Sequence, residues 1–246
     1  MNRPFTIIIP ARYESNQLIG KPLLMMGNKP LIQVVWDQAR KSNAERIIVA
    51  TDNERVLQTC AEFGAEVVMT FKDHNCGFEI LAEVIELLEI QPDELIVYMQ
   101  ADTPYNPSIL IDQVVANLIA NSDASVATLA EPIEDVKTLF NHKVVKVTTD
   151  IHGFAITFSR SVLPWALEQF DIIRDSIPEG VSFFRHVNLY ACRAEFIREF
   201  QKWGPCEQEK IEKLEQLRAI WNCIKIKVAL TCKPTNALFD SAHNIN

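Results

Sequence analysis

Short apolar runs alternate with amphipathic stretches along the first hundred residues of this chain. Runs that are rich in β-branched residues, as buried strands are, span residues 5–9, 46–50, 66–69 and 95–99. Stretches that repeat apolar residues every three or four positions, as helices do, span residues 31–40, 53–63 and 79–88. Strands that alternate with helices predict βαβ units, and therefore a parallel sheet with helices on both faces.

The second half of the chain predicts that the sheet becomes mixed. Its strand-like segments span residues 124–129, 144–148, 155–159, 187–191 and 224–230. Gly153 provides a turn between two of these segments, so we expect an antiparallel insert. A single helix is expected at residues 207–222, with an apolar stripe formed by Ile211, Leu214, Leu217 and Trp221. Because no Gly/Ser-rich linker or internal repeat divides the chain, we expect one continuous α/β domain over residues 1–246.

Composition and charge narrow the class of protein. The chain has 246 residues and 48% hydrophobic content, which is enough for one large domain. A net charge of -8 argues against a surface that coats nucleic acid, but it is compatible with a local cluster of cations. No apolar stretch reaches the length of a membrane span, and residues 1–4 lack the apolar core of a secretion signal. We therefore expect a cytoplasmic protein without membrane insertion and without a nucleic-acid partner.

The cysteines have no metal-binding spacing. None forms a Cys-x-x-Cys pair, and none has a histidine at the spacing of a zinc site. The six residues are Cys60, Cys76, Cys192, Cys206, Cys223 and Cys232. We expect them to be reduced and mostly buried.

The first strand leads into a loop with two cations. The run Ile7-Ile8-Ile9 is followed by a polar turn with Arg12, and then by Gly20-Lys21-Pro22. This loop would emerge at the carboxyl end of the strand, where open α/β sheets bind ligands. Arg12 and Lys21 at that position suit polyanionic phosphate, and a basic surface loop is the alternative.

The fourth strand ends in Gln100 and Asp102. A carboxylate at a strand end suits a hard divalent cation, and Mg²⁺ held by carboxylates plus substrate phosphates is usual in nucleotidyl transfer. The alternative is that Asp102 caps the helix that follows. The residues alone predict an anionic ligand above the strand ends, among Arg12, Lys21, Asp52 and Asp102.

A set of motifs follows in one order over nearly the whole chain. The motifs are Pro10-Ala11-Arg12-Tyr13, Gly20-Lys21-Pro22-Leu23, Val49-Ala50-Thr51-Asp52, Met69-Thr70 with Asp73-His74, Gln100-Ala101-Asp102-Thr103-Pro104, Phe158-Ser159-Arg160 with Pro164-Trp165, Arg185-His186, and Leu214-Glu215-Gln216-Leu217-Arg218. In this order they resemble the CMP-Kdo synthetases, the 3-deoxy-manno-octulosonate cytidylyltransferases. The resemblance implies a Rossmann-like nucleotidyltransferase fold, a homodimer and a requirement for Mg²⁺. It also implies that the anomeric hydroxyl of the acidic ketose Kdo attacks the α-phosphate of CTP and releases pyrophosphate, for lipopolysaccharide or capsule synthesis.

The same resemblance implies roles for individual residues. Those implied to act in catalysis are Arg12, Lys21 and Asp102. Those implied to bind the nucleotide are Arg12, Ser15, Lys21, Asp73 and Gln100. Those implied to bind the sugar acid are Arg160, His186, Glu215 and Gln216, and the implied metal ligands are Asp102 and Asp240. His186 and Glu215 have alternatives, as a core histidine and as a residue on the solvent face of its helix, and we expect Tyr190 in the core.

The chain departs from the family pattern on the nucleotide side. Where the family has Ser-x-Arg-Leu-Pro-Gly-Lys, this chain has Gln17 and Ile19 in place of arginine and proline. Where the family has Ser-Gly-Thr-Glu-Arg, this chain has Cys76, Phe78 and Ile80 in place of serine, threonine and arginine. Two guanidiniums are thereby absent, which predicts CTP binding weaker by about a hundredfold unless other cations compensate.

Three hypotheses follow from these departures. The first is a working cytidylyltransferase for Kdo or a related acid sugar, with Lys72 or Lys29 as compensating cations. The second is a transferase with a changed nucleotide or sugar preference. The third is a catalytically weakened or inactive relative that binds a ligand or a partner. In a dimer, we expect residues 132–140 and the antiparallel insert to form the contact.

Overall fold

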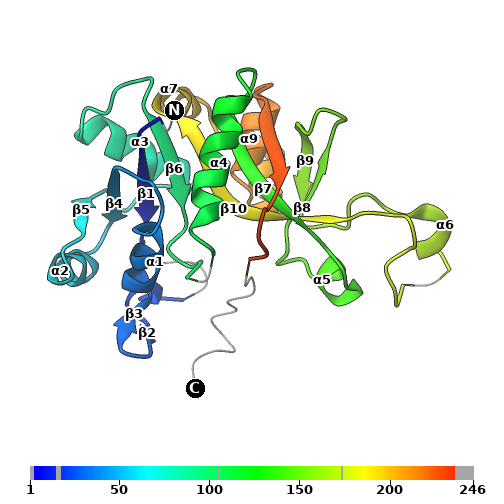
Figure 1. The fold of residues 1–246 in the computed structure, drawn as a ribbon, viewed down its shortest axis with the longest axis horizontal. Coiled ribbons are helices and arrows are strands. Elements are labelled where there is room, and N and C mark those ends of the chain that lie inside the picture. The colour runs from blue at the N-terminus through cyan, green and yellow to red at the C-terminus, as the bar shows by residue number, and fades with distance from the viewer. Residues whose placement is uncertain (1–2, 15–17, 105, 173, 236–246) are drawn as a thin grey trace.

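The computed structural model describes residues 3–14, 18–104, 106–172 and 174–235, and it shows the expected alternation of strands and helices (Figure 1). The first half contains β1 (Phe5–Pro10), η1 (Lys21–Leu23), β2 (Met25–Met26), β3 (Lys29–Pro30), α1 (Leu31–Ala39), β4 (Arg46–Thr51), α2 (Glu54–Glu62), β5 (Glu66–Met69), α3 (Gly77–Leu87), β6 (Leu95–Met99) and α4 (Ile109–Ala120). The second half contains β7 (Val126–Pro132), α5 (Val136–Phe140), β8 (Lys146–Thr149), β9 (Ala155–Ser159), α6 (Leu167–Phe170), β10 (Phe184–Arg193), α7 (Ala194–Lys202), α8 (Glu207–Glu212), α9 (Gln216–Trp221) and β11 (Ile226–Leu230).

Within the described residues, nine strands form one sheet in the order β11-β7-β10-β6-β1-β4-β5, with β8 beside β10 and β9 beside β8. The pairs β1/β4, β1/β6, β4/β5 and β7/β11 are parallel. Strand β10 is antiparallel to β6, β7 and β8, and β9 is antiparallel to β8. In this sheet β9 and β10 run opposite to the other seven strands, so it is mixed and mostly parallel in direction, with an antiparallel insert, which confirms the expected fold class.

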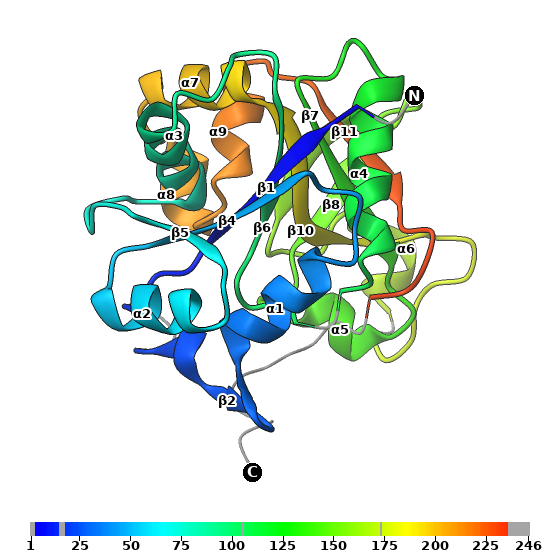
Figure 2. The ribbon, with the colours of Figure 1, turned by 60° about the vertical axis from the view of Figure 1, so that its left-hand side comes forward.

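Helices cover both faces of the sheet, and each face has its own core (Figure 2). Helices α1, α2 and α4 pack on the face that carries Ile7, Ile9 and Val97. Helices α3, α7 and α9 pack on the face that carries Ile8 and Tyr98. Successive residues of a strand point to opposite faces, so the apolar run in β1 is buried on both sides. This double burial fits the place of β1 inside the sheet, between β4 and β6.

The expectation of one long helix near the C-terminus is wrong. The structure has two helices, α8 and α9, which are separated at Lys213 with a left-handed φ of 54°. A left-handed residue ends an α-helix, so the two halves share no common apolar stripe. Leu214 and Leu217 are buried as expected, but Ile211 and Trp221 are 74% and 59% exposed.

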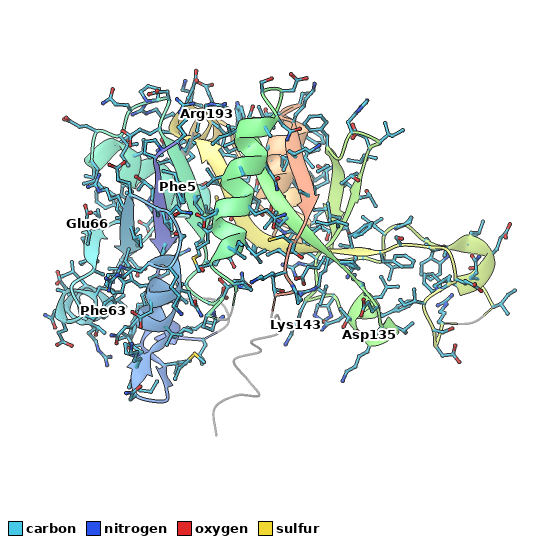
Figure 3. All side chains as sticks on the ribbon, in the orientation of Figure 1. Phe5, Phe63, Glu66, Asp135, Lys143 and Arg193 are labelled. Carbon is cyan, nitrogen blue, oxygen red and sulfur yellow. The ribbon has the colours of Figure 1, made fainter. Side chains whose placement is uncertain are left out.

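An arm projects from the sheet on the side of α5 and α6 (Figure 1). It has a small core of its own, formed by Ile133, Leu139, Val144, Phe170 and Phe183. Asp135 begins α5, because its carboxylate accepts a hydrogen bond from the backbone N–H of Thr138 at 2.8 Å. Figure 3 shows Asp135 and Lys143 on this side of the molecule, opposite Glu66 of the edge strand β5.

The cysteines are unpaired, as expected. Cys60, Cys192 and Cys206 are buried, Cys76 is half-buried, and Cys223 and Cys232 are exposed. Burial raises the pKa of the Cys60 thiol to about 12. No helix in the described part of the chain combines the length and apolar character that crossing a bilayer requires.

Candidate active site

A cavity of about 320 Å³ opens where the carboxyl ends of β1 and β6 lie side by side. It is lined by Pro10, Arg12, Lys21, Pro22, Cys76, Gly77, Ile80, Tyr98, Gln100, Ala101 and Asp102. This is the edge at which open α/β sheets bind ligands, and it brings four of the expected site residues together. A larger surface groove beside α7 contains none of the candidate residues.

The loop after β1 is closed by Gly20. Its φ of 74° lies in the left-handed region that favours glycine, and its N–H donates to the carbonyl of Tyr13 at 2.7 Å. Tyr13 is held in turn, because its own N–H donates to Asp52 at 2.9 Å. Asp52 therefore supports the loop and does not line the cavity, which corrects the expectation that it lies beside the ligand.

Lys21 and Asp102 form an ion pair inside the cavity. The Nζ of Lys21 lies 2.8 Å from Oδ2 of Asp102. Lys21 is 8% exposed, whereas 36% of the Asp102 side chain remains accessible. Asp102 does not cap α4, whose N-cap residue is Ser108. A cation and an accessible carboxylate thus share one space, as recognition of a phosphate with a divalent cation requires.

Arg12 joins the loop after β1 to the segment that precedes α3. Its guanidinium donates to the carbonyl oxygens of His74 and Lys72 at 2.9 and 3.1 Å. Glu83 of α3 anchors that segment, because its carboxylate lies 2.5 Å from Nε2 of His74 and accepts from the N–H of Phe71. A guanidinium carries five N–H donors, so Arg12 retains donors for an anion while two are used for support.

The wall formed by the start of α3 is largely apolar. A Cβ at Gly77 would lie 1.9 Å from the hydroxyl oxygen of Tyr98, so only glycine fits there. Phe78 is 1% exposed and packs in an aromatic cluster, with its ring centroid 5.2 Å from that of Tyr98. Ile80 is 2% exposed and lines the cavity. Phe78 and Ile80 are therefore packed against the protein at this wall.

Glu215 is enclosed by protein donors rather than placed on a solvent face. Its Oε2 accepts from the backbone N–H of Phe78 at 3.0 Å, and its carboxylate also hydrogen-bonds with Cys76 and Tyr98. Burial raises the pKa of Glu215, and the hydrogen bonds from Phe78, Cys76 and Tyr98 offset part of that rise. Glu215 therefore connects the start of α9 to the cavity wall, so the solvent-face alternative is wrong.

His186 and Tyr190 lie on β10, and neither lines the cavity. Burial lowers the pKa of His186 to about 3, so its imidazole is neutral near pH 7. Its Nε2 lies 2.9 Å from the hydroxyl of Thr128, and its ring packs against Phe158 and Tyr190. Tyr190 stacks on Tyr98 and is buried in the core, as expected. Among the described residues, its hydroxyl has no hydrogen-bond partner.

Arg160 is fixed by Glu212, the last residue of α8. Its Nε donates to the carbonyl of Glu212 at 2.6 Å, and its backbone N–H donates to the carboxylate of the same residue at 2.7 Å. Beneath it, Lys146 is fully buried and donates to three carbonyl oxygens, those of Asn141, Val144 and Arg160. Burial lowers the pKa of Lys146 to about 8.

Other candidate residues lie apart or outside the described part of the chain. Asp73 is exposed and does not line the cavity, and Gln216 is 3% exposed. Ser15 and Asp240 lie outside the described residues, and so does Gln17. In the described ranges, no group of three or more histidine, cysteine or acidic side chains could hold a metal ion by itself. The roles of these residues in binding stay predictions.

Two residues near the cavity have no counterpart in the predicted site. Tyr98 lines the cavity, but in the sequence it looks like any other apolar position of a buried strand. Arg218 is 1% exposed and reads as an ordinary polar position of a helix. The sequence offers one signal for Arg218, because it follows the apolar positions of the segment Leu214–Arg218. A charged residue on an apolar face needs a buried partner of opposite charge, whereas one on a solvent face does not.

A mostly parallel sheet with cations and a carboxylate at the carboxyl ends of adjacent strands defines a phosphate-binding α/β protein of the nucleotidyltransferase class. The family model for cytidylyltransferases matches residues 6–226. The chain belongs to the cytidylyltransferase family.

Relatives and solved structures agree with this assignment. A 3-deoxy-manno-octulosonate cytidylyltransferase of Pseudomonas fluorescens strain Pf-5 is 51% identical over 100% of this chain and 96% of its own. The protein of that name from Pseudomonas syringae pv. syringae strain B728a is 51% identical over 93% of this chain and 90% of its own. The structure of a CMP:2-keto-3-deoxy-manno-octonic acid synthetase complexed with CTP superimposes with a TM-score of 0.82 at 29% identity, covering 95% of this chain and 92% of that one. A Leptospira borgpetersenii cytidylyltransferase shares the fold, with a TM-score of 0.56 at 13% identity over 95% of this chain and 78% of that one.

Proposed function

We propose that this chain is a cytidylyltransferase that joins CTP to 3-deoxy-manno-octulosonate (Kdo), giving CMP-Kdo and pyrophosphate. The observation that carries the proposal is the cavity that places Arg12, Lys21 and Asp102 together at the ends of β1 and β6. Relatives about half identical over nearly the whole chain carry the corresponding name. The product supplies an activated acid sugar for lipopolysaccharide or capsule synthesis.

The reaction forms one P–O bond and breaks another. The anomeric hydroxyl oxygen of the sugar attacks the α-phosphorus of CTP, the bond to the β-phosphate oxygen breaks, and the hydroxyl proton passes to solvent. Such a displacement needs alignment and charge neutralisation, with little covalent work by the protein. Arg12 and Lys21 supply the positive charge, since both line the cavity. Binding of the triphosphate draws the Lys21 ammonium from the Asp102 carboxylate to the phosphate oxygens.

The residues present fit a magnesium ion. Mg²⁺ favours one or two carboxylates together with substrate phosphates and water, and Asp102 offers an accessible carboxylate at the phosphate end of the cavity. We propose Asp102 as a ligand and Asp240 as the second one. When bound, the ion would neutralise the charge that develops on the phosphates.

The sugar side is proposed to lie toward β10 and α9. Arg160 suits the sugar carboxylate as a bidentate partner, and Glu215 and Gln216 suit its hydroxyls. His186 would act as a neutral hydrogen-bonding group, because its pKa of about 3 excludes an imidazolium near pH 7. The unpartnered hydroxyl of Tyr190 is a further candidate for the sugar, since a buried hydroxyl without a partner is costly unless a ligand satisfies it.

The apolar wall favours a second candidate function, a weakened or altered transferase. Ile80 and Phe78 stand where the family carries arginine and threonine, and Ile80 lines the cavity. Lys29 does not compensate, because its ammonium pairs with Asp37 at 2.6 Å on the hairpin side. We propose that CTP binds mainly through Arg12 and Lys21.

Pyrophosphate release from CTP, Kdo and Mg²⁺ tests the function directly. Release that requires all three supports the transferase. No release, together with no CTP-dependent thermal shift, would favour a binding protein without turnover. A panel of nucleotides and acid sugars distinguishes an altered transferase from a CMP-Kdo synthetase. The altered transferase predicts that some other nucleotide and sugar react faster than CTP with Kdo.

The missing charges are tested by restoring them. Gln17→Arg with Ile80→Arg should lower the KM for CTP by about tenfold or more, because each guanidinium adds a charge-assisted hydrogen bond. An unchanged KM would refute the argument that charge limits CTP binding.

We also propose a homodimer in the cytoplasm, where CTP is available. The arm exposes several large apolar side chains, namely Phe140, Trp165, Leu167 and Ile172. An apolar surface of this kind on a projecting arm suits contact with a second copy.

A further inference from the structure

Arg218 of α9 is a buried charge outside the cavity. Its side chain is 1% exposed, and it does not line the cavity. Its Nε and Nη2 donate to the two carboxylate oxygens of Glu209 at 2.8 and 2.6 Å, and its guanidinium lies 4.4 Å from the centre of the Phe200 ring. Burial opposes the charge, but the hydrogen-bonded Glu209 carboxylate outweighs this and raises the pKa of Arg218. The guanidinium is therefore held charged inside the protein.

The same guanidinium reaches the turn at the start of α3. Its Nη1 donates to Oε1 of Glu79 at 3.1 Å, and its Nη2 lies 3.7 Å from Sγ of Cys76. Glu79 closes this turn, because its Oε2 accepts from the backbone N–H of Asn75 at 2.8 Å. Burial would raise the pKa of Glu79, but the Asn75 N–H and the Arg218 guanidinium outweigh it and lower that pKa. Glu79 is thus an ionised link between the arginine and the turn.

The turn that Arg218 supports forms one wall of the cavity. Cys76 and Gly77 line the cavity directly, and Gly77 has no room for a side chain. A small displacement of this turn therefore changes the cavity itself. Glu215, at the start of the same short helix, accepts from the backbone N–H of Phe78 at 3.0 Å. One segment thus holds the turn through two side chains of opposite charge, Glu215 and Arg218.

We propose that Arg218 is a positioning residue for CTP, which acts by fixing the turn at residues 76–79 against the nucleotide cavity. The inference rests on the proposed cytidylyltransferase function. The contacts of Arg218 with Glu79 and Cys76 form a brace for the turn. Because the cations Arg12 and Lys21 stand on a different loop, loss of this brace weakens CTP binding more than it slows the chemical step. Because α9 begins at the proposed sugar-binding residues, the brace also joins the sugar end of the site to its nucleotide end.

The variant Arg218→Lys tests this assignment. Lysine keeps the positive charge but loses the planar fork that contacts Glu209, Glu79 and Cys76 at once. We expect the KM for CTP to rise about tenfold, the effect of losing a hydrogen bond to a charged group, while kcat changes by less than about threefold. The matched control is Arg198→Lys on α7, whose arginine donates to the carbonyl of Ile90 away from the cavity. The control should leave both constants unchanged.

A second variant guards against loss of folding. Glu79→Gln keeps an acceptor for Arg218 but removes the negative charge. Because the Glu79 side chain is partly exposed, this substitution should destabilise the core less than Arg218→Lys does. It should raise the KM for CTP in the same direction as Arg218→Lys, by a smaller factor.

Alkylation of Cys76 reports on the turn without any need for activity. In a background with Cys223→Ser and Cys232→Ser, the exposed thiols are absent and Cys76 is the most accessible remaining one. Arg218→Lys should speed its reaction with iodoacetamide severalfold, and Arg198→Lys should not.

The two readouts separate the two proposals. If the wild-type chain releases no pyrophosphate, the proposed function fails, whereas the alkylation rate still shows whether Arg218 positions the turn. If Arg218→Lys and Glu79→Gln leave both the KM for CTP and the alkylation rate unchanged, the positioning role is overturned. A lower melting temperature with both readouts unchanged would show a structural role alone and would also overturn it.

Discussion

Lys21 is 8% exposed, and its ammonium is paired with Asp102 across 2.8 Å. Arg12 donates two hydrogen bonds to backbone carbonyls, and Glu215 accepts hydrogen bonds from three groups of the protein. Charged side chains that are held in this way lose little conformational freedom when a ligand arrives. At the scale of single residues, the candidate site is therefore preorganised by contacts among its own members.

Replacing Lys21 tests the charge in the cavity. Lys21→Met should lower pyrophosphate release by about a hundredfold or more, because it removes a preorganised cation from the developing phosphate charge. Lys29→Met is the control, since it breaks a comparable lysine–aspartate pair on the β2/β3 hairpin. Steady-state kinetics on both variants measures the effect, and equal activities would contradict the assignment of Lys21.

His186 predicts a dependence of stability on pH. Its pKa is lowered to about 3 by burial, so between about pH 6.5 and pH 3 the unfolded chain takes up a proton that the folded chain does not. The free energy of unfolding therefore falls as the pH falls through this window. Between pH 7 and pH 4, the wild type should lose about 2–3 kcal/mol more than His186→Gln does.

Urea unfolding at several pH values provides the measurement. His152→Gln is the control, because His152 lies on the exposed turn before β9. This variant should keep the wild-type slope. Parallel slopes for the wild type and His186→Gln would show that the imidazole titrates normally in the folded protein.

The elements around the cavity are short and are positioned by tertiary contacts. Helices α8 and α9 have six residues each, and Lys213 separates them in a left-handed conformation. Helices of this length are unstable alone, so their placement depends on packing and on the buried pair between Glu209 and Arg218. The break at Lys213 divides the segment into a part that holds Arg160 and a part that holds the turn at the start of α3.

The break predicts a stabilising substitution. Lys213→Gly should raise the free energy of unfolding by about 0.5–1 kcal/mol, because glycine adopts a positive φ without the clash that a side chain suffers. Lys210→Gly, inside α8, should lower it by about 1 kcal/mol. Denaturant titration compares the two, and a destabilised Lys213→Gly would show that the lysine side chain outweighs its backbone cost.

At the scale of the whole molecule, the cavity and the arm lie at different parts of the sheet. The cavity lies at the carboxyl ends of β1 and β6, near the middle of the sheet, while the arm extends beyond β8 with a separate core (Figure 1). We therefore expect ligand binding and the proposed dimer contact to use different surfaces. An exposed apolar surface on the arm predicts association through that side.

Light scattering with size exclusion checks the assembly. The wild type should elute as a dimer at micromolar concentration. Leu167→Glu should elute as a monomer, because it places a charge among the exposed apolar residues of the arm. Ile211→Glu is the control, since Ile211 is equally large and exposed but lies on α8. A monomeric wild type, or a dimeric Leu167→Glu, would contradict the arm as the interface.

The sequence by itself determined the strands of the main sheet and the edge of that sheet that carries the site, whereas it gave no sign of β2 and β3. Runs such as Ile7-Ile8-Ile9 are buried on both faces, so local composition alone specifies them, and β5, β6 and β9 have the bounds expected for them. Parallel strands then place Arg12, Lys21 and Asp102 at one edge, because their carboxyl ends meet there.

Only the tertiary structure decided how the charged side chains are used. The pairing of Lys21 with Asp102, the enclosure of Glu215 and the burial of Arg218 join residues far apart in the chain. The end of α8 at Lys213 also appears only in the structure, since apolar periodicity continues through a residue whose φ is 54°. Periodicity reports which residues avoid water, but the partner of a buried charge depends on which distant segments fold against it.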